Sequence, residues 1–385
     1  MAGRPLRLLT FTSLFPGPGR PNHGVFVRNR LEHLLATHSV EAAVLAPMPH
    51  PPWSLRDAES AARGAAVLHP GFAHVRGLGQ WTAPLALRRA ALRALAHPLL
   101  AGRRFDLIDA HYLYPDGVAA LALGRRLGIP VVVTARGSDV TQMPDHAWPR
   151  RQVLRVIRES AALIAVSGGL RERLIELGAP ADKVTVLRNG VDLTRFRPAD
   201  RAAARTAFGL DGPALVSVGG LIARKRHDLT IAALALLPEW RLLIAGEGPE
   251  RGRLEALAAS RGLAGRVRFL GPLPHAELAP LYTAADISVL ASEREGWANV
   301  LLESMACGTP VVASRIPGNP EVVAAPAAGR IVAANTPEGF AAAIRDLAAA
   351  TDRAATRAYA EDFSWDATSA GQMAVFHAVL AKGRA

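Results

Sequence analysis

Cysteine is nearly absent from this chain, because its 385 residues include only Cys307. A single cysteine excludes an internal disulfide framework and fits a protein that stays in the reducing cytoplasm. Aromatic residues make up only 5% of the chain and are not interleaved with a basic block, which disfavours nucleic acid as a partner. No uninterrupted apolar run approaches the roughly 20 residues that a membrane-spanning helix needs.

Lysine is also rare, although the formal net charge is +12. The lysines are Lys183, Lys225 and Lys382, and arginine supplies the rest of the positive charge. A positive chain favours anionic partners such as nucleotides and acidic lipid surfaces. An Arg- and Ala-rich composition is also a common product of a GC-rich genome. Peripheral contact with the anionic inner face of a membrane therefore stays an open alternative to a purely cytoplasmic location.

The chain lacks the glycine fingerprint of a classical dinucleotide site. The loop after the first predicted strand, 12–24, contains prolines where the G-x-G-x-x-G pattern would stand. Proline has no backbone N–H to offer a pyrophosphate. A nicotinamide-dependent enzyme is therefore disfavoured.

Short apolar runs alternate with longer segments of helical periodicity along the whole chain. Continuous apolar runs indicate parallel strands covered on both faces, so we predict an α/β fold with two Rossmann-like, doubly wound domains. A linker-like stretch, 189–212, separates the two series of strands. The predicted strands are 6–11, 40–46, 105–110, 131–134, 163–166 and 184–187, then 214–218, 242–245, 267–270, 287–290 and 311–313.

The most informative stretch is Glu295–Ala313, which reads EGWANVLLESMACGTPVVA. Its pattern predicts a helix over 298–307 that ends at Gly308. If the whole interval were helical, the Cα atoms of Glu295 and Glu303 would lie roughly 12 Å apart along the axis. Each carboxylate can bind hydroxyl groups, and the helix N-terminus between them can bind an anion. A nucleotide-sugar has the same order of groups, with a diphosphate between the hydroxyls of its sugar and those of its ribose. A solvated loop residue and a surface helix position are the alternative.

Two glycine-containing loops follow strands of the second series. Gly219-Gly220 leads into Arg224-Lys225-Arg226, a candidate clamp for a diphosphate. Gly246-Glu247-Gly248 follows the next strand and predicts a tight turn against which a nucleobase or ribose could lie. A solvated basic loop is the alternative for the arginine and lysine run.

Four residues of the first series also stand at strand or helix ends. Gly24 precedes a predicted helix, where the backbone could approach a ligand, and His111 ends a predicted strand. Arg136 and Asp139 lie in the loop after the next strand, and either could face a ligand. An ordinary loop glycine, a structural histidine and a solvated turn are the alternatives.

In this order and spacing, the motifs resemble the GT-B glycosyltransferases of the GT4-type retaining family, glycosyl transferases group 1. The resemblance covers nearly the whole chain, and its most specific element is the E-x7-E pattern of Glu295 and Glu303. It implies an acceptor-binding domain over 1–195, a donor-binding domain over 196–360, and a last helix over 361–385 that packs back on the first domain. Supporting matches are Asn189-Gly190-Val191-Asp192 with Phe196, the segment from Gly219 to Lys225, Gly246-Glu247-Gly248-Pro249, and Phe363-Ser364-Trp365.

The resemblance also implies roles for individual residues. Glu295 would bind the hydroxyls of the donor sugar, Glu303 the ribose, and Lys225 the diphosphate. The family usually has arginine at the position of Gly220, and Arg224 is a candidate substitute for it. The implied catalytic residues are Glu295, His111 and Lys225. The implied donor-binding residues are Gly24, Gly220, Arg224, Lys225, Gly246, Glu247, Gly248, Gly296, Trp297, Ala298, Asn299, Val300, Leu301 and Glu303, with Arg136 and Asp139 on the acceptor side.

The activity implied is retaining transfer of a sugar from a nucleoside diphosphate-sugar to a sugar, lipid-linked or small-molecule acceptor, in cell-envelope polysaccharide or glycoconjugate synthesis. No Asp-x-Asp pair occurs in the sequence, and Lys225 with the helix end can balance the charge of a diphosphate leaving group. We therefore expect no metal and no other cofactor. A nucleotide-sugar epimerase of related shape and a non-catalytic nucleotide-sugar-binding subunit are the alternatives.

Overall fold

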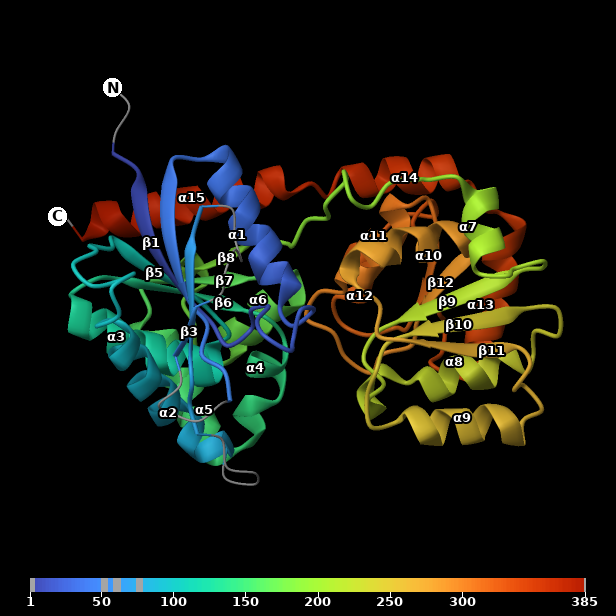
Figure 1. Cartoon of the computed structure of the whole chain (residues 1–385), viewed down its shortest axis with the longest axis horizontal. Helices are drawn as coiled ribbons and strands as arrows, with labels where there is room; N and C mark the ends of the chain where they lie inside the picture. The colour runs from blue at the N-terminus through green and yellow to red at the C-terminus, as the bar shows by residue number, and fades with distance from the viewer. Residues whose placement is uncertain (1–3, 50–54, 58–63, 74–78, 384–385) are drawn as a thin grey trace. The chain divides into compact units, whose positions relative to one another are not determined.

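The computed structural model describes residues 4–49, 55–57, 64–73 and 79–383. The chain forms two compact units, each built around its own sheet (Figure 1). Unit 1 comprises Met1–Asn189 and Trp365–Ala385, and unit 2 comprises Gly190–Ser364. The predicted fold of two Rossmann-like domains is confirmed. The acceptor- and donor-binding roles given to 1–195, 196–360 and 361–385 stay predictions.

The sheet of unit 1 has the strand order β3-β4-β2-β1-β5-β6-β7-β8. Its strands are parallel except for the edge strand β3, which pairs antiparallel with β4. The central strands are buried along their length because helices cover both faces of a parallel sheet. The strands are β1 Leu6–Phe11, β2 Val40–Leu45, β3 Leu55–Asp57, β4 Ala66–Pro70, β5 Leu107–His111, β6 Val131–Ala135, β7 Ala162–Ala165 and β8 Val184–Val186.

The helices of unit 1 form two layers (Figure 1). The last helix, α15, packs beside α1 and contributes Met373, Phe376 and Val379 to the core that also holds Leu8 and Val27. The helices α2, α3 and α5 pack together as the second layer. The helices are α1 Val25–Thr37, α2 Gly79–Ala94, α3 Val118–Leu127, α4 Ser138–Thr141, α5 Ala147–Glu159, α6 Gly168–Glu176 and α15 Trp365–Lys382.

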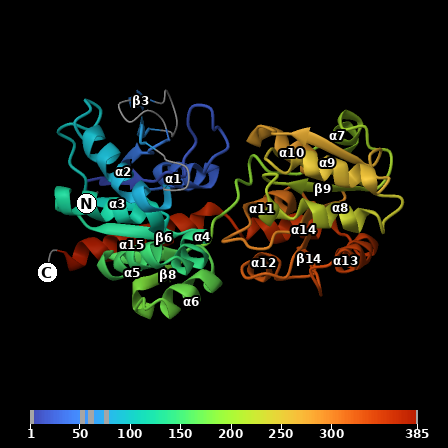
Figure 2. The same ribbon diagram turned by 90° about the horizontal axis from the view of Figure 1, so that it is seen from below.

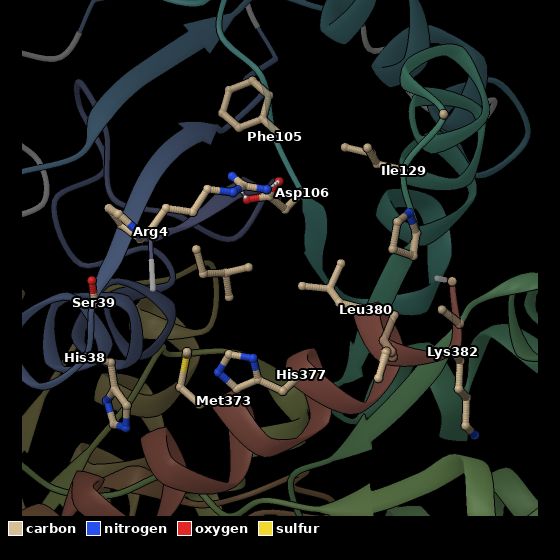
Figure 3. Close-up of a pocket in the computed structure, with 18 residues that line it drawn as sticks. Arg4, His38, Ser39, Phe105, Asp106, Ile129, Met373, His377, Leu380 and Lys382 are labelled. Atoms are coloured by element: carbon tan, nitrogen blue, oxygen red, sulfur yellow. Dashed lines mark hydrogen bonds and ion pairs between the residues drawn. The ribbon is translucent and has the colours of Figure 1, made fainter. Parts of the chain in front are cut away.

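A groove of about 1100 Å³ opens at the amino ends of β1, β5 and β6 (Figure 3). The C-terminal half of α15 lines it with Met373 and Leu380, and Ile129 lies opposite. Arg4 forms an ion pair with Asp106 across its edge at 2.9 Å. The groove therefore lies at the amino ends of the strands. The candidate residues of unit 1 lie at the opposite, carboxyl ends.

The sheet of unit 2 is parallel throughout, with the order β11-β10-β9-β12-β13-β14 (Figures 1 and 2). Its strands are β9 Ala214–Val218, β10 Arg241–Ala245, β11 Val267–Gly271, β12 Ile287–Leu290, β13 Val311–Ala313 and β14 Gly329–Ile331. Its helices are α7 Arg201–Ala207, α8 His227–Leu234, α9 Arg251–Ser260, α10 Leu278–Ala284, α11 Asn299–Ala306, α12 Asn319–Val322, α13 Pro337–Ala349 and α14 Arg353–Glu361. Helix α13 lies beside β14 at the sheet edge (Figure 2).

The strands predicted from apolar runs all occur, with ends that differ by at most two residues. Three strands were not predicted: the edge strands β3 and β14, and β4, which lies next to β3. Two of them are only three residues long, and β4 carries His69 and Pro70 within its five residues. Such short or mixed segments have no hydrophobic pattern, because pairing with a neighbouring strand, rather than their own sequence, makes them strands.

Candidate functional site

The predicted helix at the centre of the E-x7-E stretch forms as α11, Asn299–Ala306. Gly308 adopts a positive φ of 76° after the helix, and its N–H donates to the carbonyl of Met305 at 2.8 Å, as a C-terminal glycine should. The N-cap residue is Ala298, which has no polar side chain to satisfy the first N–H groups. The residues before it are not helical, so the helical estimate of the distance from Glu295 to Glu303 does not apply.

Glu295 forms an ion pair with Lys225, whose Nζ lies 2.6 Å from Oε1. Arg224 approaches the other carboxylate oxygen at 3.8 Å. The side chains of Lys225 and Glu295 are only 13% and 11% exposed. Burial alone would raise the pKa of Glu295, but the charge and hydrogen bond of Lys225 outweigh it and hold this pKa below its ordinary value. Glu295 is therefore ionised and fixed between two cations.

The two cations come from a 3₁₀ turn, Ala223–Lys225, that follows β9. The N–H of Glu293 donates to the carbonyl of Arg224 at 2.9 Å, which joins this turn to the loop after β12. Arg226 closes the turn in a left-handed conformation and pairs with Asp228 and Glu293 instead of Glu295. The adjacent strands β9 and β12 therefore bring Lys225 and Glu295 together at their carboxyl ends.

The glycines of the second loop allow two backbones to touch. Gly246 and Gly248 lie against Gly219 and Leu221, and the N–H of Leu221 donates to the carbonyl of Glu247 at 2.9 Å. A Cβ on Gly246 would lie 1.9 Å from the carbonyl oxygen of Gly219. The structure thus gives these glycines a packing role beside Lys225, while the side chain of Glu247 is exposed. Their contact with a nucleobase or ribose stays a prediction.

Gly246→Ala will lower the free energy of unfolding by at least about 2 kcal/mol, because the new methyl group forces the two loops apart. Urea unfolding of the purified variant measures this change. Gly252→Ala in α9 is the control, since a Cβ there meets nothing within 4 Å and should stabilise the helix by about 0.5–1 kcal/mol. Equal effects of the two substitutions would contradict the packing role.

Glu303 is held by two side chains that were not among the predicted site residues. Its Oε1 lies 3.0 Å from His275 Nε2, and its Oε2 accepts from Tyr282 Oη at 3.4 Å. Arg195 donates to Nδ1 of His275 at 3.0 Å, so the histidine hydrogen is on Nε2 and points at Glu303. Burial and the charge of Glu303 raise the pKa of Tyr282 well above its ordinary value. Its hydroxyl therefore remains a donor.

A sequence signal existed for His275 but not for the other partners of Glu303. His275 follows β11, where a polar residue at the carboxyl end of a parallel strand is a candidate for a site. Tyr282 lies within α10, and Arg195 lies in the segment before α7. Nothing in the spacing of these residues links them to Glu303, which is only 12% exposed in the structure.

In unit 1, His111 lies at the end of β5 with both ring nitrogens engaged. Arg136 lies 2.8 Å from Nδ1, and Asp109 Oδ2 lies 3.4 Å from Nε2. Because arginine can only donate, Nδ1 accepts and Nε2 carries the hydrogen. Burial, with the charge of Arg136, lowers the pKa of His111 to about 4 in spite of Asp109. The imidazole is 1% exposed and neutral near pH 7.

Arg136 and Asp139, predicted on the acceptor side, are both buried and bonded within unit 1. Arg136 also donates to Oδ1 of Asn189 at 2.9 Å. The carboxylate of Asp139 accepts the backbone N–H groups of Leu113 at 2.8 Å and Gly137 at 2.7 Å. Asp139 therefore joins the loops after β5 and β6, and contact of either residue with an acceptor stays a prediction.

Gly24 caps α1 with a φ of 67°, directly against the loop that follows β1. A Cβ at this position would lie 2.3 Å from the carbonyl of Leu14, so no other residue fits without displacing the loop. Asp116 holds the same loop by accepting the N–H of Ser13 and, at 3.0 Å, its hydroxyl. The N-terminus of α1 is thus fixed at the carboxyl edge of the sheet, with glycine as its cap.

Asp116 should make the stability of unit 1 depend on pH. Burial raises its pKa to about 7. A carboxyl group whose pKa is raised on folding contributes stability that is complete below its unfolded pKa of about 4 and is lost as the pH rises to about 7. Asp116→Asn cannot titrate, so wild-type stability should fall relative to this variant by on the order of 1 kcal/mol or more between pH 4 and 7. Urea unfolding at both pH values tests this, and a constant difference would contradict it.

The candidate residues are therefore brought together as two sets, one in each unit. In unit 2, Glu295 contacts Lys225 and Arg224. Glu295 precedes α11 in the chain, and Glu303 lies within that helix. In unit 1, His111 meets Arg136. Within the described ranges, no group of three or more His, Cys, Asp and Glu side chains is arranged to hold a metal ion. Over the same residues, no helix has the length and apolar character needed to cross a membrane.

Two family models match consecutive parts of this chain. Glycosyltransferase Family 4 matches residues 23–195, and Glycosyl transferases group 1 matches residues 200–362. D-inositol 3-phosphate glycosyltransferase of Segniliparus rotundus is 34% identical over 304 residues, which cover 73% of this chain and 68% of that protein. The chain belongs to the group 1 glycosyltransferases of the GT4 type.

Solved structures place the fold in the same class. Sucrose-phosphate synthase from Thermosynechococcus elongatus has a TM-score of 0.84 at 22% identity, covering 98% of this chain and 100% of that one. HepE of Anabaena, in complex with UDP-glucose, has a TM-score of 0.73 at 20% identity, covering 98% and 99%. The fold is therefore that of the GT-B glycosyltransferases.

Proposed function

We propose that this glycosyltransferase moves a hexose from a nucleoside diphosphate donor to an acceptor, with retention of the anomeric configuration and without a metal ion. The observation that carries the proposal is the buried pair of Lys225 and Glu295, held next to the start of α11. An ionised carboxylate accepts hydrogen bonds from the hydroxyl groups of a sugar, and the cations beside it attract phosphate. One sugar and one phosphate can thus be bound side by side.

Each part of the donor has a group suited to it within unit 2. Glu295 would accept sugar hydroxyls, and Glu303 would accept ribose hydroxyls at lone pairs that His275 and Tyr282 leave over. The start of α11 and Lys225 would hold the diphosphate. Arg224, 3.8 Å from Glu295, would supply the second cation that Gly220 cannot.

The same cations would assist bond breaking. Departure of the nucleoside diphosphate puts negative charge on its terminal phosphate, and donors fixed beforehand stabilise that charge at little cost in reorganisation. Lys225 has three N–H donors, so it can bind a phosphate oxygen while keeping its hydrogen bond to Glu295. This arrangement supplies the positive charge that a divalent ion would otherwise supply.

Relatives support the donor class without fixing the acceptor. HepE was crystallised with UDP-glucose, and the Segniliparus relative is named for an inositol phosphate. A sugar, a lipid-linked sugar or a small polyol would each fit a role in cell-envelope polysaccharide or glycoconjugate synthesis. Location in the cytoplasm, with peripheral contact at the inner face of the membrane, stays a prediction.

Isothermal titration with UDP and GDP in the presence of EDTA tests the proposal. We expect one of the two to bind, and the matching nucleotide-sugars should release nucleotide in the presence of an acceptor. Absence of binding for every nucleoside diphosphate at millimolar concentration would overturn the proposal. Proton NMR of the donor without acceptor separates the alternative, since an epimerase changes the sugar unaided.

A further inference from the structure

A cluster of charged and polar side chains is buried inside unit 1, where it joins β5 and the loop after β6 to α1 and α15. We call it the Asp109 cluster. Its members are nearly inaccessible: Arg30 is 1% exposed, Asp109 2%, His111 1%, Arg136 9% and Gln372 1%. Buried charges are costly unless they are paired and hydrogen-bonded, so the order of these contacts matters.

Gln372 of α15 joins two charged residues of the cluster. Its amide nitrogen donates to Asp109 Oδ2 at 2.8 Å, and its amide oxygen accepts from Arg30 Nε at 2.9 Å. Arginine can only donate and an ionised carboxylate can only accept. The amide therefore has one orientation in which both bonds exist, with its oxygen toward Arg30 and its nitrogen toward Asp109.

Asp109, which is held by Gln372, in turn contacts the ring of His111. The carboxylate oxygen that accepts from Gln372 is also the one that lies 3.4 Å from His111 Nε2. On the other side of the ring, Arg136 lies 2.8 Å from Nδ1. The imidazole is thus held from both sides as the neutral tautomer with its hydrogen on Nε2.

Docking of α15 does not require an amide at this position. Phe376, Met373 and Val379 bury their side chains in the core of unit 1. One turn earlier, Ser369 Oγ lies 2.9 Å from His33 Nδ1 and already joins α15 to α1. An apolar residue in place of Gln372 would keep these contacts of α15, but it would leave Asp109 without that donor and Arg30 Nε without that acceptor.

We propose that Gln372 is a positioning residue for His111, acting through Asp109 to fix the ring orientation and tautomer at the end of β5. The proposal rests on the proposed function, because His111 bears on transfer only if the donor sugar lies beside it. In this proposal, a residue of α15 fixes the ring orientation and tautomer of a histidine on β5. Gln372 touches neither substrate nor reacting atoms in this role.

Gln372→Met tests this directly, because methionine has a similar length and no hydrogen bonds to give. We expect the Nε2-bound hydrogen signal of His111 to change in proton–nitrogen NMR of histidine-labelled protein. His111→Gln identifies that signal among the 12 histidines. Misplacement of the ring should lower the transfer rate by about tenfold to a hundredfold. Ser369→Ala is the matched control on α15, and it should leave both readouts at their wild-type values.

Gln372→Glu supplies a second readout that a merely structural role would not show. A carboxyl group there donates to Asp109 only while it is protonated, so His111 signals and transfer should follow a new pH-dependent step that wild type lacks. Wild-type His111 signals in Gln372→Met, or no new step in Gln372→Glu if the first variant fails to fold, would overturn the proposal. The NMR comparison needs no donor, so it stands even if wild type transfers no sugar and the proposed function fails.

Discussion

Lys225→Met will lower the transfer rate by about 10²–10³-fold, the size of effect seen when one fixed donor to a developing negative charge is removed. The substitution keeps most of the apolar stem and removes the ammonium that lies 2.6 Å from Glu295. Arg224 is then the nearest cation to the carboxylate, at 3.8 Å and with a side chain that is 38% exposed. Rates measured at saturating donor isolate the loss in the chemical step.

The same variant should also reverse the pH dependence of stability at Glu295. In the wild type, Lys225 lowers the pKa of Glu295, so the pair stabilises the fold above the unfolded pKa and loses that contribution as the pH falls. Without Lys225, burial is opposed only by the hydrogen bond of Ser292 and the charge of Arg224, so we expect the pKa to rise and the buried carboxylate to destabilise the fold as the pH rises. The difference between the two proteins should therefore grow from pH 4 to pH 7, to about 3–5 kcal/mol, the cost of removing one partner of a buried ion pair.

Arg226→Met is the matched control for Lys225→Met. It removes the next cation of the same run, one that pairs with Asp228 and Glu293 and lies outside the Glu295 pair. We expect transfer to stay within about threefold of wild type, because partly exposed ion pairs contribute little. Equal losses in the two variants would mean that the run acts only through its total charge.

The position of Lys225 and Glu295 at the carboxyl ends of parallel strands could be predicted from the sequence, whereas their pairing depends on the adjacency of β9 and β12 in the sheet. Apolar runs mark β9 and β12, parallel strands end at one edge of the sheet, and polar residues follow both strand ends. The limits of α11 were equally readable, since Gly308 ends the helix by its own conformational freedom. These features depend on residues close together in the sequence or on a single packing rule.

Burial of polar residues could not be predicted in the same way. Arg136 and Asp139 lie in a loop whose polar sequence is typical of a solvated turn. In the structure, each is buried and hydrogen-bonded to residues of other segments. The partners of Glu303 and the link from Gln372 to Asp109 likewise join residues far apart in the chain. Hydrogen bonds of this kind depend on tertiary packing, and the hydrophobic periodicity of the sequence does not predict them.

Glu303→Ala will weaken binding of the nucleoside diphosphate by about 10- to 100-fold, the worth of a hydrogen bond to a charged group. The side chain is 12% exposed and already fixed by His275 and Tyr282, so little ordering is needed when ribose hydroxyls bind. Transfer at saturating donor should change little, because ribose is not where charge develops. Glu277→Ala, an exposed glutamate beside His275, is the control and should bind as wild type does.

Titration of the free nucleoside separates the two glutamate-lined ends of the site. Glu303→Ala should weaken uridine and UDP, or guanosine and GDP, by the same factor, because both contain the ribose. Lys225→Met should weaken only the diphosphate, because its ammonium has no partner in a nucleoside. If Glu303→Ala left nucleoside binding intact, the carboxylate would not hold the ribose. Its contacts with His275 and Tyr282 would then serve only to pack α10 and the turn before it against α11.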